Sequence, residues 1–241
     1  MATSMPTRDQ ILNAARRIRD GKLVAFPTET VYGLGADATN GLAVAEIFAA
    51  KGRPEFNPLI VHVATLHQAR RFAEFSPSAL SLAKAFWPGP LSLVLPLKEG
   101  NPIAPLVTAG LETIAVRQPD HPVAQDLIIA AERPLAAPSA NLSGHVSATT
   151  AEHVATDFRN IDLTILDGGP TAIGLESTIV RCIDGTAEIL RTGAITDEEL
   201  KRHVALTEPS PLQDPQKPSA PGQLASHYAP SVPLRLDARH V

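Results

Sequence analysis

The chain has 241 residues, of which 44% are hydrophobic and 19% charged, values typical of a globular protein that buries a sizeable core. The formal net charge of −4 argues against a nucleic-acid-binding surface that is basic overall, and the single cysteine excludes an intrachain disulfide and a multi-cysteine zinc site. No apolar run reaches the about 18 residues of a membrane helix, and the N-terminus lacks the apolar core of a signal peptide, so we expect a cytoplasmic protein with no membrane partner.

Strands and helices are predicted to interleave along most of the chain. Apolar spacing and capping signals predict helices from Thr7 to about Gly21, over 42–51, 78–86 and 123–131, from Thr149 to about Phe158, and from Thr196 to about Ala205. Short apolar or β-branched runs predict strands over 23–26, 59–63, 91–95, 114–117, 135–137, 163–166, 178–183 and 187–190. Asp184-Gly185 is a hairpin signal, so the last two strands are expected to pair antiparallel. The predicted class is therefore α/β with a twisted, mixed parallel and antiparallel sheet.

The composition changes after Thr207, where five prolines fall between positions 209 and 221. Such a stretch is typical of a semi-rigid extended linker. We therefore predict a catalytic domain over residues 8–206 and a Pro-rich linker or lid over 207–241. About thirty residues are too few for a second domain, so we expect the chain to lack one.

The common nucleotide-binding and nucleophile motifs are missing. Gly169 and Gly174 have the spacing that begins a P-loop, but Leu175-Glu176 stands where the motif requires Lys followed by Ser or Thr. Without that lysine we reject a P-loop. No serine-hydrolase elbow or paired-cysteine motif occurs either.

Four other segments carry polar residues next to predicted strands. Residues 27–35 combine hydroxyls with close glycines, which suits a loop that brings backbone against a ligand, although a simple turn explains them equally well. Lys51, Arg53 and Asn57 precede a buried strand and can bind a polyanion, whereas Lys51 alone is explained by its place at a helix C-terminus. The other two segments are 137–144, with Ser139 and Asn141, and 174–180, which precedes Arg191 and Gly193.

Together these segments resemble the YrdC-domain family of threonylcarbamoyl-AMP synthases. The resemblance rests on 27–35, on Lys51-x-Arg53 with Ser139-x-Asn141, on 87–91, on 114–117 and on 176–178, and it covers about residues 8–205. The tail 219–230 resembles the linker of longer, two-domain members. The resemblance implies a mixed α/β sheet with a concave, locally basic central cavity. It also implies that L-threonine, bicarbonate and ATP are converted to threonylcarbamoyl-AMP and pyrophosphate, for the threonylcarbamoyl-adenosine modification of tRNA.

The family's functional residues can be carried onto matching positions. The catalytic residues implied are Lys51 and Arg53. Threonine is implied to lie among Thr30, His62, Arg117, Ala137 and Ser177, with Arg117 binding its carboxylate. The nucleotide is implied to contact Arg53, Asn57, Thr113, Ser139, Asn141, Ser147, Arg191 and the tail residue Tyr228. No protein-held metal is implied, and Mg²⁺ is expected to arrive on the phosphates of ATP.

Two other functions compete with this interpretation. A double-stranded RNA-binding module without catalysis would suit a large basic cavity, but the acidic balance of the chain argues against it. A carbamoyl-transfer domain for metallocentre assembly shares the fold but normally lies within a longer protein with zinc-finger cysteines. Partners beyond the substrates are expected to be tRNA or a tRNA-modifying protein.

Overall fold

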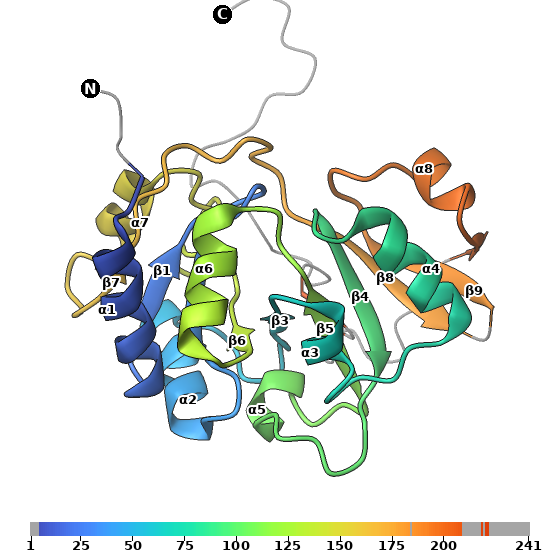
Figure 1. Ribbon diagram of the computed structural model, residues 1–241, viewed down its shortest axis with the longest axis horizontal. Coiled ribbons are helices and arrows are strands. Elements are labelled where there is room, and N and C mark those ends of the chain that lie inside the picture. The colour runs from blue at the N-terminus through green and yellow to red at the C-terminus, as the bar shows by residue number, and fades with distance from the viewer. Residues whose placement is uncertain (1–4, 184, 209–217, 219, 222–241) are drawn as a thin grey trace, which may run out of the picture.

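The computed structural model describes residues 5–183, 185–208, 218, 220 and 221. Within them, helices and strands alternate around a single sheet (Figure 1). The helices are α1 (Arg8–Arg19), α2 (Gly41–Lys51), α3 (Leu66–Ala69), α4 (Pro77–Phe86), α5 (Pro105–Thr108), α6 (Pro122–Ala131), α7 (Ala151–Asp157) and α8 (Asp197–Lys201). The strands are β1 (Val24–Phe26), β2 (Gly33–Asp37), β3 (Ile60–His62), β4 (Leu91–Pro96), β5 (Thr113–Arg117), β6 (Leu135–Ala136), β7 (Thr164–Ile165), β8 (Thr178–Ile183), β9 (Thr186–Arg191) and β10 (Ala205–Thr207).

The sheet is mixed, as the sequence predicts. Its ten strands run in the order β10-β9-β8-β4-β5-β3-β6-β2-β1-β7. Pairs such as β3–β5 and β4–β8 are parallel, whereas β4–β5, β3–β6 and β8–β9 are antiparallel. The hairpin predicted for the last two strands is therefore confirmed. No helix in the described part of the chain is long and apolar enough to cross a membrane.

Strand β2 was not predicted, because its sequence Gly-Leu-Gly-Ala-Asp contains two glycines that are poor strand formers. The structure explains why glycines stand there. A Cβ at Gly35 would lie 2.7 Å from the ring of Phe26 on the paired strand β1, and one at Gly33 would lie 3.2 Å from it. The glycines let Phe26 lie flat across β2. The ligand loop predicted over 27–35 is therefore shorter and ends at Tyr32.

The helix ends follow capping residues, with two corrections. The capping boxes at Thr7 and Thr196 are both present. The predicted box at Thr149 is wrong, because Thr150 is the N-cap of α7 and its hydroxyl accepts from the His153 amide. Helix α8 ends at Lys201 rather than near Ala205, and residues 205–207 instead form β10 parallel to β9. Short helices and strands of this kind carry too little periodicity to be recognised.

The two faces of the central strands have different roles. Side chains alternate along a strand, so Val61 and Val116 enter the large core cluster, to which α2, α4, α5 and α8 contribute. On the other face, the parallel register places His62 of β3 beside Arg117 of β5. Helices α1 and α6 pack side by side over β1 and β6, in a second cluster that includes Phe26 (Figure 1). Polar residues thus gather on the sheet next to the α1–α6 layer.

Candidate active site

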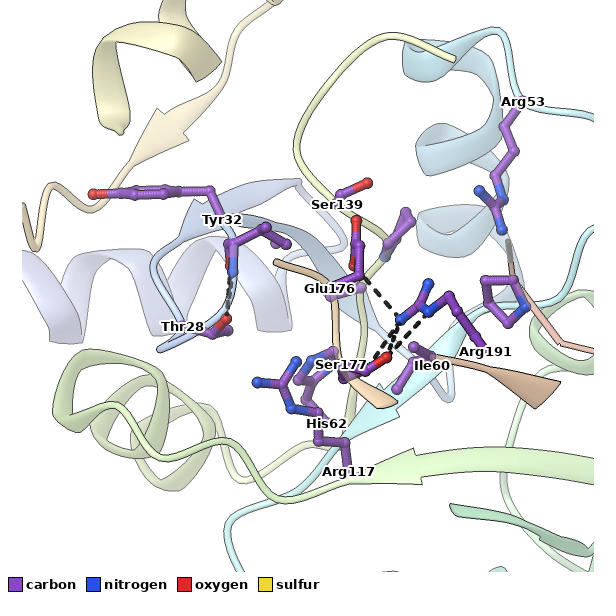
Figure 2. A pocket seen from close by; sticks show the side chains of 15 residues that line it. Thr28, Tyr32, Arg53, Ile60, His62, Arg117, Ser139, Glu176, Ser177 and Arg191 are labelled. Atoms are coloured by element: carbon purple, nitrogen blue, oxygen red, sulfur yellow. Dashed lines mark hydrogen bonds and ion pairs between the residues drawn. The ribbon is translucent and has the colours of Figure 1, made fainter. Parts of the chain in front are cut away.

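A pocket lies over this polar face and is lined by residues from strands β2, β3, β5 and β9 and from the segments between them (Figure 2). Its lining residues are Thr28, Val31, Tyr32, Gly33, Arg53, Ile60, His62, Arg117, Ala137, Pro138, Ser139, Glu176, Ser177, Arg191 and Pro221. The open volume is about 30 Å³, far below the about 300–1,000 Å³ of pockets that hold drug-sized ligands. The large concave cavity that we expected is therefore not confirmed, and a substrate needs side chains to move.

Arg117 occupies one end of the pocket and is held on three sides. Its Nη2 donates to the Glu29 carboxylate at 2.6 Å, its Nη1 to the Thr30 hydroxyl at 2.9 Å, and its Nε to the Gly89 carbonyl at 3.2 Å. Glu29 also accepts from the Asp120 amide at 3.0 Å. A guanidinium carries five N–H donors, so these bonds leave one on each terminal nitrogen. Arg117 is thus fixed in orientation and can still bind a carboxylate.

His62 is the neutral neighbour of this cation. Burial and the positive charge of Arg117 lower the pKa of His62 to about 3, so its imidazole carries no charge at neutral pH. Its ring meets the ring of Phe26 edge-on, with centroids 6.0 Å apart. The Nδ1 atom is buried and has no hydrogen-bond partner among the residues that the structure describes. Since orphaned buried polar atoms are costly, this nitrogen is suited to a polar group of a ligand.

At the other end of the pocket, Arg191, Ser177 and Glu176 form a network (Figure 2). Arg191 donates to the carbonyl and, at 3.0 Å, to the hydroxyl of Ser177, whose hydroxyl also lies 2.8 Å from that of Ser92. The second oxygen of Glu176 lies 3.6 Å from Nη2 of Arg191. The first accepts from the Ser147 hydroxyl at 2.6 Å. This end is therefore built from loops and from the end of β9.

The two predicted catalytic cations have different surroundings. Arg53 lines the pocket and donates to the carbonyls of Asn57 and Pro58 at 3.2 and 2.9 Å. Lys51 is buried beneath the pocket lining, where its ammonium donates to the carbonyl of Ser139 at 2.6 Å and to that of Asn141. Burial and the charge of Arg53 lower the pKa of Lys51 to about 7, although Glu176 opposes this shift. Lys51 thus holds the turn that presents Ser139.

The structure brings together seven of the predicted site residues that it describes and leaves six elsewhere. Those on the pocket lining are Arg53, His62, Arg117, Ala137, Ser139, Ser177 and Arg191. Four others form hydrogen bonds with lining residues: Thr30 with Arg117, Lys51 and Asn141 with Ser139, and Ser147 with Glu176. Asn57 is buried, and its carbonyl accepts from Arg53. Thr113 lies at the opposite end of β5 from Arg117, paired with Pro96, and does not line the pocket. Tyr228 lies outside the described residues.

A short piece of the Pro-rich tail returns to the pocket. Ala220 is fully buried and packs with Ile60, Val94, Ala115 and Ile179 on the polar side of the sheet. Its neighbour Pro221 lines the pocket itself. The boundary predicted at residue 206 stays a prediction, but these contacts place this part of the tail at the site.

Two acidic residues of the site were missed by sequence reasoning. Glu29 falls in the segment Thr28-Glu29-Thr30, which was noted for its hydroxyls and glycines. Glu176 belongs to the fingerprint Glu176-Ser-Thr178 but was given no role. A carboxylate within a segment that is otherwise small and apolar is the available signal, since such a group needs a cation when buried.

A resident metal site does not fit these residues. Among the described residues no three His, Cys, Asp or Glu side chains cluster closely enough to hold an ion. The charged groups on the described pocket lining are three arginines and Glu176.

Comparison with known families gives a match over most of the chain. The model Sua5_yciO_yrdC, described as "Telomere recombination", matches residues 16–193. The chain belongs to the Sua5/YciO/YrdC family. A second family model, described as "Threonylcarbamoyl-AMP synthase, C-terminal domain", matches residues 195–240 and so spans the predicted boundary at 206.

Curated relatives of this family are similar along nearly the whole chain. The threonylcarbamoyl-AMP synthase of Bacillus subtilis is 50% identical over 230 residues, which cover 94% of this chain and 66% of the relative. The enzyme of the same name from Pyrococcus abyssi is 50% identical over 223 residues, covering 91% of this chain and 65% of the relative. The chain therefore spans slightly less than two thirds of the length of these relatives.

Solved structures agree with the family assignment. The crystal structure of P. abyssi Sua5 complexed with L-threonine superposes with a TM-score of 0.85 and 46% identity, covering 95% of this chain and 68% of that one. Escherichia coli YciO superposes with a TM-score of 0.72 at 22% identity, covering 81% and 94% of the two chains, which supports the fold alone.

Proposed function

We propose that the protein is an L-threonylcarbamoyladenylate synthase, a nucleotidyltransferase that acts on L-threonine, bicarbonate and ATP. The observation that carries the proposal is the Arg117–Glu29–Thr30 array beside the neutral His62, because it offers a fixed guanidinium for a carboxylate and a neutral polar group, in a pocket with two further arginines. Support comes from the P. abyssi relative of known structure, which is described as complexed with L-threonine.

Threonine would bind at the end of the pocket that contains Arg117. The remaining N–H groups of Arg117 can form paired hydrogen bonds with the substrate carboxylate, a geometry that guanidinium groups favour. The orphaned Nδ1 of His62 can bond to the substrate hydroxyl or amine. Ala137 also lines the pocket, and its amide donates to the Ile60 carbonyl at 3.0 Å, so its own carbonyl oxygen is the backbone group proposed to face threonine.

The nucleotide would occupy the end with Arg53, Ser139 and Arg191. Two guanidinium groups at the pocket lining suit a triphosphate, which is recognised by charge-assisted hydrogen bonds. Asn57, Asn141, Ser147, Thr113 and Tyr228 stay proposed nucleotide contacts, as the family resemblance implies. Mg²⁺ would enter with ATP as part of the substrate.

The chemistry needs no covalent enzyme intermediate. The threonine amine forms a C–N bond to the carbon of bicarbonate, with loss of water, to give a carbamate. A carbamate oxygen then attacks the α-phosphorus of ATP, the α–β phosphoanhydride bond breaks, and pyrophosphate leaves. Catalysis is therefore mostly positioning of two anionic reactants and neutralisation of their charge, for which the arginines of the pocket are suited.

The product would serve the threonylcarbamoyl modification of tRNA adenosine in the cytoplasm. An activated carbamate is hydrolysable, so the next reaction in the sequence must transfer it to an acceptor, and tRNA or a tRNA-modifying protein is the partner proposed. A double-stranded RNA-binding role without catalysis has less support, because the net charge is −4.

Pyrophosphate release tests the function. We expect release from ATP to require both threonine and bicarbonate, and threonylcarbamoyl-AMP to accumulate in equal amount. Arg53→Ala should lower the rate about 10- to 100-fold, because hydrogen bonds to charged groups contribute about 1.5–3 kcal/mol each. Glu46→Gln, on the exposed side of α2, is the matched control and should keep full activity. Release of pyrophosphate that ignores threonine would contradict the proposal.

A further inference from the structure

Glu176 is the one carboxylate on the described pocket lining, and it lies at the end proposed for the nucleotide (Figure 2). The two oxygens of its carboxylate contact side chains from two different parts of the chain. One accepts from the hydroxyl of Ser147, in the loop before α7, at 2.6 Å, and the other lies 3.6 Å from the guanidinium of Arg191, at the end of β9. The carboxylate therefore connects the loop before α7 to the end of β9.

A hydroxyl and a guanidinium are the groups that proteins use to bind phosphate oxygens. In the structure the Ser147 hydroxyl donates to one oxygen of Glu176, and the guanidinium of Arg191, which donates to Ser177, lies at ion-pair distance from the other oxygen. This side chain therefore occupies the place of a substrate anion. A fixed negative charge there would also repel a triphosphate, since unit charges a few ångströms apart interact strongly at a partly buried site. Glu176 and a polyphosphate therefore compete for the Ser147 hydroxyl and for the positive charge of Arg191.

We infer that Glu176 is an internal stand-in for the substrate anion, which the polyphosphate of the nucleotide displaces from Ser147 and Arg191 when it binds. The inference rests on the proposed function, because that function supplies the anion. It assigns Glu176 a specificity role, since a ligand gains these donors only when it offers anionic oxygens that replace the carboxylate.

The backbone around Glu176 restricts how this exchange can happen. The amide of Gly174 bonds to the Thr30 carbonyl at 3.0 Å, and that of Thr178 bonds to the Pro90 carbonyl at 3.0 Å. A Cβ at Gly193 would overlap the backbone of residues 176–178, so the chain is clamped on that side as well. Displacement must therefore be a rotation of the Glu176 side chain rather than an opening of the loop. The neighbouring side chain of Leu175 is 60% exposed, which shows that solvent is next to this edge of the pocket.

A different role for Glu176 predicts the opposite result. If its carboxylate accepted a hydrogen bond from the bound nucleotide, for example from a ribose hydroxyl, removing the charge would weaken binding. If it only held Ser147 and Arg191 in position, the neutral amide of glutamine would either preserve binding or weaken it. Tighter binding on loss of the charge is expected from competition alone.

Calorimetry with inorganic pyrophosphate is the test, on the full chain. We expect Glu176→Gln to bind pyrophosphate about three- to tenfold more tightly than the wild type, while the dissociation constant of L-threonine changes less than twofold. Glu46→Gln again serves as the matched control, since it removes one negative charge far from these contacts, and it should leave both constants unchanged. Equal or weaker pyrophosphate binding by Glu176→Gln, or no binding by either protein, would overturn the inference.

A second variant keeps the test informative if Glu176→Gln folds poorly. Glu176→Asp retains the charge but shortens the reach to Ser147, so its affinity should lie between those of the wild type and the glutamine variant. An aspartate variant that binds pyrophosphate more weakly than the wild type would count against displacement. Because these measurements need no turnover, they are separate from the proposed reaction: tighter binding without threonine-dependent pyrophosphate release would refute the function and keep the inference.

Discussion

At one end of the pocket Arg117 donates to Glu29, Thr30 and the Gly89 carbonyl, whereas at the other end Arg191 and Ser147 both meet Glu176. The first set lies on β5 and in a loop that is fully buried, with Arg117 and Glu29 at 4% and 10% side-chain exposure. The second set comes from loops and a strand end. The Arg117 end is thus held by buried hydrogen bonds in the resting structure, while the Arg191 end is held by a contact that, on the inference above, a polyphosphate replaces.

This difference predicts opposite responses to mutation at the two ends. A buried ion pair contributes to folding and to binding together, because removing one partner leaves the other charge uncompensated. A contact that a ligand replaces contributes to the resting structure but opposes binding. Four experiments, in order of expected size, test whether the two ends differ in this way.

The largest effect is expected from Arg117→Met, which leaves Glu29 buried without its counter-charge. The free energy of unfolding should fall by about 3–5 kcal/mol, as for other buried pairs that lose one partner. Chemical denaturation measures it. Arg17→Met is the control, since it breaks the exposed pair with Asp162 and should cost at most about 1 kcal/mol. Similar losses in the two variants would show that the amino-acid end is not a buried ionic array.

Gly193→Ala should have the next largest effect, because its Cβ would overlap the Glu176 carbonyl and the Thr178 amide. The backbone must shift, at a cost of about 1–3 kcal/mol in unfolding free energy. The shift also moves Ser177 and Glu176, so ATP-dependent activity should fall more than threonine affinity. Gly41→Ala, where the nearest atom to a new Cβ is 4.0 Å away, should be neutral. An unaffected Gly193→Ala would mean that this segment is not clamped.

A smaller effect should come from Lys51, which supports the Ser139 turn at the nucleotide end. Its pKa is lowered from 10.5 to about 7, so between these values the unfolded chain binds more protons than the folded one. The free energy of unfolding should therefore rise with pH across this window, by at most about 1.4 kcal/mol per pH unit. Denaturation at pH 7 and pH 9, compared with Lys51→Met, isolates the contribution. If the difference between the two proteins is flat with pH, the ammonium is not buried as described.

The smallest effect concerns the substrate itself. The methyl group that serine lacks contributes about 1 kcal/mol of transfer free energy, so kcat/KM for serine should be only about fivefold below that for threonine. Valine, which lacks the hydroxyl, should be a much poorer substrate, because the Nδ1 atom of His62 would then stay buried without a partner from the substrate. Equal rates with valine and threonine would exclude recognition of the hydroxyl.

Much of the fold and part of the site could be predicted from the sequence. Long apolar segments such as α1 and α6 and the strand ending in Arg117 were placed correctly, since their periodicity and capping are local properties. Strand β2 was missed because its glycines are selected by the ring of Phe26, a contact that the sequence does not display. The same holds for Glu29, whose role depends on a partner 88 positions away.

Lys51 shows where motif reasoning is incomplete. Its spacing to Arg53 predicts two cations acting on one polyanion, yet only the latter reaches the pocket lining. Helix α2 ends at Lys51, and Gly52 then turns the chain with a φ of 58°. The ammonium is therefore directed at the carbonyls of Ser139 and Asn141. The spacing of two residues along the sequence cannot show which side chain lines the pocket and which one only supports the residues that line it.

The lengths of the outermost strands bear on whether molecules of this protein associate with one another in solution. Among the described residues the sheet has ten strands, and its two edges are β7 and β10, of only two and three residues. An edge strand exposes unpaired backbone groups that can recruit the edge of another molecule. Strands as short as β7 and β10 expose few of these groups. We therefore expect little edge-to-edge pairing between molecules, even though the sheet itself is wide.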